Sequence, residues 1–239
     1  MDEQTQEGPQ EGGRQPIGRR DVLRLLGIGL STAGLIGCST RTTTRRLPGP
    51  DFPILGSNDP GRSVAVAPSS SQVLPFQVRG RQNWTSAKPN YSDMNRMSPI
   101  RHITVHHDGM RPFTNASVTA AAARLEIIRR AHLNRGWADI GYHFAIDRGG
   151  RSWACRPLGW QGAHVADCNP GNVGIVVLGN FDEQQPSRAQ VMALKKLLGE
   201  VQTAYRVPAR NVRSHQEWPS ARTACPGRNL QVHMNAIRA

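Results

Sequence analysis

Apolar positions are distributed unevenly along this chain of 239 residues. Residues 1–15 are polar without a period, residues 25–37 are apolar and rich in glycine, and residues 39–71 are rich in Thr, Arg, Pro, Gly and Ser. A sustained apolar period starts only near residue 78. The pattern therefore predicts one globular domain over 78–239, preceded by segments that do not belong to its core.

Within the domain, short β-rich runs alternate with segments of helical period. Such interleaving is typical of a single α/β domain, in which helices flank one central sheet. The pattern predicts strands over 101–105, 140–147, 152–156 and 173–178, a short segment over 211–214, and helices over 118–134, 187–205 and 230–238.

Local signals support the first predicted helix. Its apolar residues recur at helical spacing and include Ala121, Leu125, Ile128 and Leu133. Gly136 follows as a plausible C-cap, because glycine adopts the left-handed conformation that often ends a helix.

Two further elements carry clear signals. Ser187 and Gln190 match a capping box at the start of the helix over 187–205. The run Val-Gly-Ile-Val-Val-Leu over 173–178 is almost continuously apolar, which predicts a strand buried on both faces. The Arg-Gly-Gly-Arg sequence over 148–151 predicts the turn of a hairpin.

Composition narrows the class of protein. Hydrophobic residues make up 38% of the chain and aromatic residues 5%, which excludes a multi-span membrane protein, a coiled coil and a wholly disordered chain. The chain has 30 Lys and Arg residues against 17 Asp and Glu, a net charge of +13, and 27 of the basic residues are arginine. This balance favours a polyanionic partner, such as nucleic acid, anionic lipid or a cell-wall polymer.

The beginning of the chain has the features of an export signal. Arg19 and Arg20 precede the apolar run over 25–37, which at 13 residues is shorter than the roughly 20 residues that span a membrane. This order resembles a twin-arginine signal, and the Leu-Ile-Gly-Cys sequence that ends at Cys38 resembles a bacterial lipobox. An ordinary buried helix with a chance arginine pair is the alternative.

These features predict the organisation and location of the protein. Residues 1–37 are expected to be a twin-arginine-like lipoprotein signal peptide, Cys38 to carry the lipid, and residues 38–77 to form a flexible tether. The protein would then be exported to the cell envelope and anchored by its lipid to a membrane. Export, scattered arginines and the lack of a known nucleic-acid motif argue against nucleic acid as the partner.

Histidine and cysteine side chains of the domain suggest a metal site. His106 and His107 end the first strand, His215 follows the short segment over 211–214, and Cys225 stands in the sequence Thr-Ala-Cys-Pro-Gly. Histidine and thiolate are preferred zinc ligands, and a catalytic zinc has three protein ligands and one open position. The spacing is not that of a zinc finger, so the residues alone also allow each histidine to be a hydrogen-bonded surface or core residue.

The block Gly-Trp-Ala-Asp-Ile-Gly-Tyr-His-Phe over 136–144 resembles the signature of the zinc-dependent N-acetylmuramoyl-L-alanine amidases of the amidase-2 type, which include phage amidase lysozymes and peptidoglycan recognition proteins. The resemblance covers about residues 79–239 and implies an α/β fold with a central mixed sheet. Further segments resemble the family in the same order: Arg-Gln-Asn-Trp over 81–84, Ile-Thr-Val-His-His over 103–107, Gly-Ala-His over 162–164 with Asn169, Val-Gly-Ile over 173–175 with Leu-Gly-Asn-Phe over 178–181, and His215 through Cys225-Pro226-Gly227.

The resemblance implies roles for individual residues. His106, His215 and Cys225 match the three zinc ligands of the family. Tyr142 matches a tyrosine beside the catalytic water, and Thr223 matches a position that helps to stabilise the oxyanion. Phage members usually carry lysine at that position, and a neutral hydroxyl is a weaker donor than a lysine.

Other polar residues of the matching segments have less defined roles. His164 matches a histidine that lines the substrate groove. His107 and His143 match no ligand and are expected to be structural or to support the ligands. The residue that moves the proton is left open between Tyr142 and Glu217, and Glu217 can also be an ordinary solvated carboxylate.

Two further cysteines, Cys155 and Cys168, lie outside the zinc motif. In an exported protein they can form a disulfide that closes a small loop around Trp160 and His164. The alternative is two separate thiols, since the sequence does not show whether the two sulfur atoms approach each other.

Together, the signals predict a lipid-anchored amidase that binds one zinc ion per chain. It would hydrolyse the bond between N-acetylmuramic acid and L-alanine of peptidoglycan. The alternative is a binding module of the same fold that recognises peptidoglycan without cutting it. Non-catalytic relatives typically lack the cysteine ligand or the tyrosine, so the presence of Cys225 and Tyr142 favours activity. Nothing in the sequence requires more than a monomer.

Overall fold

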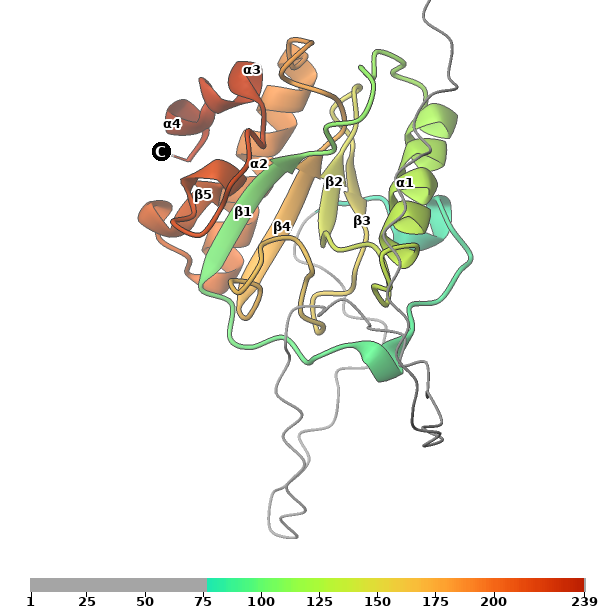
Figure 1. Ribbon diagram of the computed structural model, residues 1–239. Helices are drawn as coiled ribbons and strands as arrows, with labels where there is room; N and C mark the ends of the chain where they lie inside the picture. The colour runs from blue at the N-terminus through green and yellow to red at the C-terminus, as the bar shows by residue number, and fades with distance from the viewer. Residues whose placement is uncertain (1–76, 239) are drawn as a thin grey trace, which may run out of the picture. The chain divides into compact units, whose positions relative to one another are not determined.

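A five-stranded sheet lies at the centre of the fold (Figure 1). The computed structural model describes residues 77–238 of the chain. The strand order is β3-β2-β4-β1-β5, and β3 runs antiparallel to β2 while the other pairs are parallel. The sheet is therefore mixed and flanked by helices, which confirms the predicted α/β fold class. The strands are β1 (His102–His107), β2 (Phe144–Ile146), β3 (Ser152–Ala154), β4 (Asn172–Val177) and β5 (Val212–Ser214).

Strand β4 occupies the middle of the sheet, between β2 and β1. All six of its residues are buried. A parallel strand that is covered on both faces needs small or apolar side chains on both, and the run Val173–Val177 supplies them. The prediction of a strand buried on both faces is confirmed.

Helices cover the two faces of the sheet, with α1 on one face and the three later helices on the other (Figure 1). Leu125 of α1 packs in one cluster with Trp153 and Val176. Leu194 of α2 packs in a second cluster with Ile103 on the opposite face. The α-helices are α1 (Val118–Leu133), α2 (Arg188–Tyr205), α3 (Arg228–Gln231) and α4 (Met234–Ile237), and single 3₁₀ turns are found at Arg81–Asn83, Tyr91–Asp93, Ala209–Asn211 and His215–Glu217.

The buried face of α1 differs from the prediction at one position. Ala121, Leu125 and Ile128 are buried as expected, but Leu133 is 37% exposed. His132 takes the fourth buried position instead, because four residues beyond Ile128 a side chain returns to the same face of the helix.

Helix α2 begins with the predicted capping box. The Ser187 hydroxyl accepts from the Gln190 N–H at 3.1 Å, and the Gln190 side-chain oxygen accepts from the Ser187 N–H at 3.0 Å. The Gln190 amide also donates to the Leu178 carbonyl oxygen at 2.9 Å. The cap therefore satisfies two free helix donors and ties the start of α2 to the end of β4.

Two predicted elements are shorter than the pattern suggests. The expected strand over 140–147 is regular only as β2, because the Gly141 N–H donates to His132 and the Gly141 carbonyl accepts from Ala163 instead of joining a ladder. The expected helix over 230–238 is divided into α3 and α4, with a break at residues 232–233. Apolar spacing alone does not reveal such a break.

The free edge of β3 is covered by the chain just before the first 3₁₀ turn. The Arg79 N–H donates to the Ser152 carbonyl oxygen, and the Ala154 N–H donates to the Arg79 carbonyl oxygen, both at 2.8 Å. The Arg79 guanidinium also lies over the Trp153 ring, with its carbon 5.2 Å from the ring centroid. Arg79 thus pairs with β3 as an isolated bridge rather than as a sixth strand.

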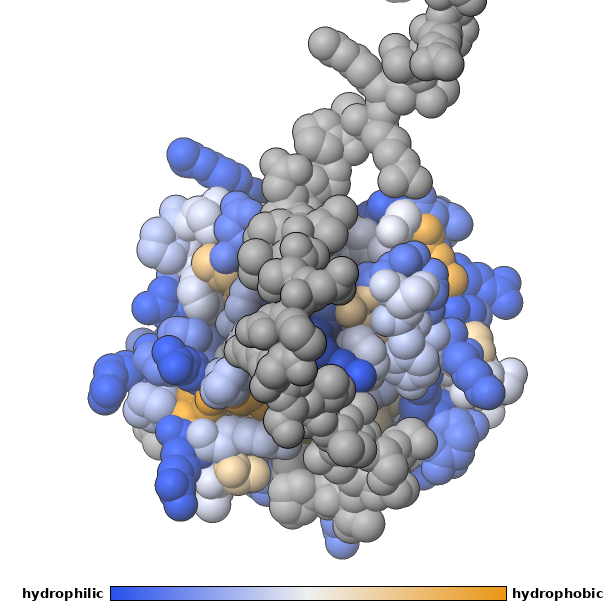
Figure 2. Space-filling model, turned by 90° about the horizontal axis from the view of Figure 1, so that it is seen from below, coloured by the Kyte–Doolittle hydropathy of each residue, from blue (hydrophilic) through white to orange (hydrophobic). Residues whose placement is uncertain are grey.

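The predicted signal peptide over 1–37, the lipidation site Cys38 and all but the last residue of the tether over 38–77 lie outside the described residues. Among the described residues, no helix has the length and hydropathy to cross a membrane. Figure 2 shows the face seen from below, where hydrophilic residues form much of the outline and hydrophobic residues form small separate areas.

Candidate metal centre and active site

The fold brings together His106, His215 and Cys225, which are far apart in the sequence. One ligand atom from each lies within 4.8 Å of the others. His106 stands near the end of β1 and His215 directly follows β5, so the parallel pairing of these two strands places both histidines at one edge of the sheet. Cys225 comes from the loop before α3, and its Sγ lies 3.6 Å from Nδ1 of His106. Two imidazoles and one thiol at these distances fit a zinc ion with an open fourth position.

Burial keeps these three groups neutral when no cation is bound. It lowers the pKa of His106 well below its ordinary value and also lowers the pKa of His215. Burial raises the pKa of the Cys225 thiol to about 12. A neutral imidazole is the form that binds metal, whereas the thiol must lose its proton on binding, so metal uptake releases a proton.

Backbone hydrogen bonds hold the Cys225 loop against the strand ends. The His107 N–H points at the Cys225 Sγ, 3.4 Å away. The Gln216 N–H donates to the Cys225 carbonyl oxygen at 2.8 Å, and the Cys225 N–H donates to Oγ1 of Thr223 at 3.1 Å. His107 directly follows His106, and Gln216 directly follows His215. These contacts therefore tie Cys225 to the residue after each candidate histidine ligand and fix the position of its sulfur.

Glu217 anchors the turn that carries His215. Its Oε2 accepts from the Ser214 N–H at 2.8 Å, and Arg238 donates to both carboxylate oxygens at 2.9 and 2.8 Å. Burial alone raises the pKa of Glu217, but hydrogen bonds from Arg238, Ser214 and Gln231 outweigh it and hold the pKa below its usual value. A carboxylate engaged in this way holds the turn in place, which leaves Tyr142 as the better candidate for proton transfer.

Tyr142 and Thr223 flank the three candidate ligands. The Tyr142 ring lies beside His106, with 5.1 Å between the ring centroids. Burial raises the pKa of the Tyr142 hydroxyl, so it holds its proton at neutral pH. Thr223 is exposed, and its oxygen accepts from the Cys225 N–H. Its own hydroxyl hydrogen has no acceptor among the described residues and can point outward to a substrate oxygen.

His164 lies behind His106 rather than on an open surface. Its residue exposure is 8%. Nδ1 of His164 is 3.1 Å from Nε2 of His106, and Nε2 of His164 is 3.1 Å from the Asn172 carbonyl oxygen. In the structure, both ring nitrogens of His164 contact other groups of the protein. The role in a substrate groove that the resemblance implies stays a prediction.

The two histidines without a ligand role are also bonded to the backbone. Nδ1 of His143 accepts from the Gly174 N–H at 3.0 Å, and its Nε2 donates to the Trp160 carbonyl oxygen at 3.0 Å. Nδ1 of His107 accepts from the Phe181 N–H at 3.2 Å. Both rings therefore brace the backbone around the candidate ligands.

Cys155 and Cys168 are free thiols in the structure rather than a disulfide. Cys155 is 2% exposed and belongs to the cluster on the α1 face of the sheet, whereas Cys168 is partly exposed in the loop before β4. The structure thus agrees with the alternative of two separate thiols, and a disulfide would require the two side chains to leave these environments.

His132 has a structural role that sequence reasoning missed. Its Nδ1 accepts from the Gly141 N–H at 2.9 Å, and its ring packs against Trp137 and Tyr142. It therefore connects α1 to the segment that carries Tyr142. A buried histidine looks like an exposed polar residue in a hydropathy pattern, and only the spacing from Ile128 could have indicated it.

We expect His132 to make the folded protein sensitive to acid. Burial, followed by the charges of Arg135 and Arg156, lowers its pKa from 6.5 to about 3. Between these values the unfolded chain binds a proton that the folded chain does not. The stability contributed by neutral His132 is therefore fully present above pH 6.5 and falls toward pH 3, by up to about 1.4 kcal/mol per pH unit.

Urea unfolding from pH 7 to pH 4 measures this effect. The free energy of unfolding of the wild type should fall more steeply than that of His132→Gln, which keeps a neutral acceptor for the Gly141 N–H. Parallel curves for the two proteins would contradict the assignment.

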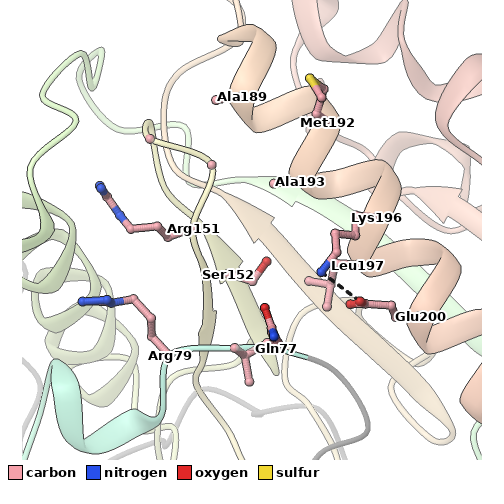
Figure 3. Close-up of a pocket in the computed structure, with 13 residues that line it drawn as sticks. Gln77, Arg79, Arg151, Ser152, Ala189, Met192, Ala193, Lys196, Leu197 and Glu200 are labelled. Atoms are coloured by element: carbon pink, nitrogen blue, oxygen red, sulfur yellow. Dashed lines mark ion pairs between the residues drawn. The ribbon is translucent and has the colours of Figure 1, made fainter.

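A cavity lies between α2 and the turn that joins β2 to β3 (Figure 3). It has a volume of about 800 Å³ and is bordered by α2, the turn over 149–151 and the chain around Arg79. The ion pair between Lys196 and Glu200, at 3.0 Å, lies at its wall. None of the candidate site residues lines it, so it is separate from the metal centre.

Comparisons with known proteins agree with the geometry. Residues 96–228 match the family model described as N-acetylmuramoyl-L-alanine amidase. The N-acetylmuramoyl-L-alanine amidase of Sus scrofa is 30% identical over 155 residues, which are 63% of this chain but only 25% of that protein. The chain thus spans about a quarter of the length of that relative.

Insect proteins match over more of their length. Peptidoglycan-recognition protein SC2 of Drosophila melanogaster is 31% identical over 173 residues, which are 70% of this chain and 89% of that protein. A solved mutant of Drosophila PGRP-LB in complex with tracheal cytotoxin has a TM-score of 0.58 and 27% identity, with coverage of 65% of this chain and 92% of that one.

Proposed function

The chain belongs to the N-acetylmuramoyl-L-alanine amidase family, and from this premise we propose that it is a zinc-dependent hydrolase of peptidoglycan. The bond that it cleaves is the amide between N-acetylmuramic acid and L-alanine of the stem peptide. The observation that carries the proposal is the cluster of His106, His215 and Cys225 within 4.8 Å of one another, next to Tyr142 and Thr223.

The donor set fits one zinc ion. When bound, zinc polarises a carbonyl and lowers the pKa of a water ligand from 15.7 to about 7, which provides a nucleophile at neutral pH. His106, His215 and Cys225 would hold the ion, and the side next to Tyr142 and Thr223 would stay open for the substrate amide.

The other side chains would complete the site. The Tyr142 hydroxyl, which keeps its proton at neutral pH, can orient the attacking water and donate to the leaving nitrogen. The Thr223 hydroxyl, oriented by the Cys225 N–H, can donate to the oxygen that becomes negative in the transition state. Glu217, by contrast, is occupied in holding the His215 turn.

A recognition module that binds peptidoglycan without cutting it is the second candidate. Relatives of this chain bind peptidoglycan fragments, so binding alone does not separate the two functions. The complete trio of candidate ligands and the adjacent Tyr142 favour hydrolysis.

We also propose that the protein acts outside the cytoplasm, in the cell envelope. The twin-arginine-like sequence and the Cys38 lipobox support export and a lipid anchor, and the net charge of +13 suits an anionic polymer or membrane surface. A twin-arginine route carries folded proteins, so zinc would be loaded before export. Removal of the lipid by Cys38→Ser should release the protein from the membrane fraction.

Incubation of the purified protein with peptidoglycan tests the proposed activity. The readout is the appearance of new L-alanine amino termini, with and without a zinc chelator and after zinc is restored. Release that stops with the chelator and returns with zinc supports the amidase. If the protein binds one zinc ion and co-sediments with the polymer but releases no L-alanine amino termini, its function is recognition rather than hydrolysis. A protein that binds neither zinc nor the polymer would exclude both the amidase and the recognition module.

Substitution of Thr223 tests the oxyanion donor. Thr223→Val keeps the shape of the side chain but removes its hydroxyl, which is also the acceptor of the Cys225 N–H. We therefore expect kcat to fall roughly 10- to 100-fold when the rate is compared for the wild type and the variant with equal zinc content. Thr223→Ser should restore most of the rate. Full activity of the valine variant would show that the Thr223 hydroxyl is not the oxyanion donor.

A further inference from the structure

We propose that His164 is a positioning residue, which fixes the orientation and the hydrogen-bonding state of His106 so that Nδ1 of His106 faces the metal position. The inference rests on the zinc centre of the proposed function, and it assigns His164 a place inside that centre instead of in the substrate groove. It follows from a chain of hydrogen bonds in which only one direction of donation is possible.

The chain of hydrogen bonds starts at a group that can only accept. Nε2 of His164 lies 3.1 Å from the carbonyl oxygen of Asn172. A carbonyl oxygen has no hydrogen to donate, so Nε2 of His164 carries the ring hydrogen. In a neutral imidazole the other nitrogen is then an acceptor, and Nδ1 of His164 therefore presents its lone pair.

That lone pair determines the state of His106. Nδ1 of His164 is 3.1 Å from Nε2 of His106, so Nε2 of His106 must donate the hydrogen between them. The hydrogen of the His106 ring is thereby placed on Nε2, and Nδ1 keeps its lone pair. Nδ1 is the atom that lies 3.6 Å from the Cys225 Sγ, on the side of the candidate metal position.

The His164 ring is held in a slot that leaves little room for another orientation. A Cβ atom added at Gly162 would lie 2.5 Å from the ring, and one added at Gly174 would lie 2.6 Å from it. The His164 N–H donates to the side-chain oxygen of Asn169 at 2.9 Å. Two glycines and one backbone contact thus set the place of the ring.

Asn172, whose carbonyl oxygen starts this series of hydrogen bonds, is itself held in place by its side chain. The Asn172 side-chain oxygen accepts from the Thr104 hydroxyl at 2.9 Å, and its nitrogen donates to the Cys168 carbonyl oxygen at 2.8 Å. Nε1 of Trp218 donates to the Thr104 oxygen at 2.9 Å. Thr104, Asn172 and Trp218 are buried, so solvent does not compete for these hydrogen bonds, and they hold the residue whose carbonyl oxygen accepts from His164.

Metal binding by three variants tests the inference. His164→Leu removes the acceptor, so its affinity for zinc should fall about 10- to 100-fold. His164→Asn offers a side-chain oxygen near the former Nδ1 and should recover most of the affinity. The control is His132→Gln, which removes another buried histidine that does not contact the three ligands and should bind zinc within about twofold of the wild type. Zinc affinity is measured by competition with a chromophoric chelator, and the absorption spectrum of the cobalt-substituted protein reports the ligand geometry.

The hydrogen position is measured separately in the metal-free protein. Nitrogen-15 NMR of the imidazole rings should show His106 with its hydrogen on Nε2 in the wild type, and a mixture of both forms in His164→Leu. A His106 hydrogen on Nδ1 in the wild type would overturn the inference. So would a folded His164→Leu variant that binds zinc as tightly as the wild type. If the wild type binds no zinc, the proposed function fails, and the NMR result still decides the role of His164.

Discussion

Replacement of Cys225 by alanine should abolish both tight zinc binding and hydrolysis, with a loss of activity above roughly 1,000-fold. The Cys225 sulfur is one of three candidate ligand atoms, and the two histidines that remain do not make a complete catalytic site. The thiol is also the only one of the three groups that contributes a negative charge when it binds metal. The measurement is the zinc content after gel filtration, together with the release of L-alanine amino termini from peptidoglycan.

The chain offers matched controls for the loss of a thiol. Cys155→Ala removes a cysteine that is as deeply buried as Cys225, and Cys168→Ala removes a partly exposed one. Both variants should keep zinc and activity. If Cys225→Ala retained one tightly held zinc ion, the ligand assignment would be wrong, and equal losses in Cys155→Ala would point to general destabilisation.

Replacement of Asp139 by alanine should lower the free energy of unfolding by about 3–5 kcal/mol. The Asp139 side chain is fully buried, and its two oxygens accept from the Arg81 guanidinium at 2.9 Å each. Arg81 also donates to the carbonyl oxygens of Ala87 and Cys155. Without the carboxylate, a mostly buried guanidinium is left without its counter-charge.

Chemical unfolding measures the loss, with an exposed ion pair as the control. Lys196 pairs with Glu200 on the surface of α2, where the lysine side chain is 63% exposed. Lys196→Ala should cost less than about 0.5 kcal/mol, because solvent screens such a pair. If Asp139→Ala cost no more than Lys196→Ala, the buried pair would not be a major source of stability.

Asp139 also has a functional consequence, because it lies three residues before Tyr142. Arg156, which is 4% exposed, donates to the backbone carbonyl oxygens of Asp139, Ile140 and Gln161. Two arginines thus brace the segment that delivers the tyrosine. We expect Asp139→Ala to impair the placement of Tyr142 even at temperatures where the protein stays folded.

Local patterns were sufficient to predict several elements. The capping box at Ser187 and the apolar run of β4 involve residues close together in sequence, whose preferences hold wherever the segment packs. The predicted place of Leu133 on the buried face of α1 was wrong. Helical spacing allows either of two adjacent positions on that face, and hydropathy favours a leucine over His132. The break between α3 and α4 also has no signal in the apolar pattern.

The sequence indicated which residues form the candidate site, but not which hydrogen bonds hold their side chains in place. The three ligand residues came from resemblance to a family, since their spacing has no zinc-binding pattern of its own. The role of Glu217 as the anchor of a turn depends on Arg238, which lies 21 residues later in the sequence. The place of His164 depends on a backbone carbonyl and on two glycines, and none of these partners can be recognised as such in the sequence.

The bridge between Arg79 and β3 has a consequence for how this domain can be separated from the residues before it. An uncovered edge strand offers free N–H and carbonyl groups to any other chain in solution, and this is a common route to aggregation. A truncation that begins after Arg79 would remove the covering residue and expose Ser152 and Ala154 to neighbouring molecules. A proteolytic or engineered cut that keeps this edge covered therefore has to leave Arg79 attached to the domain.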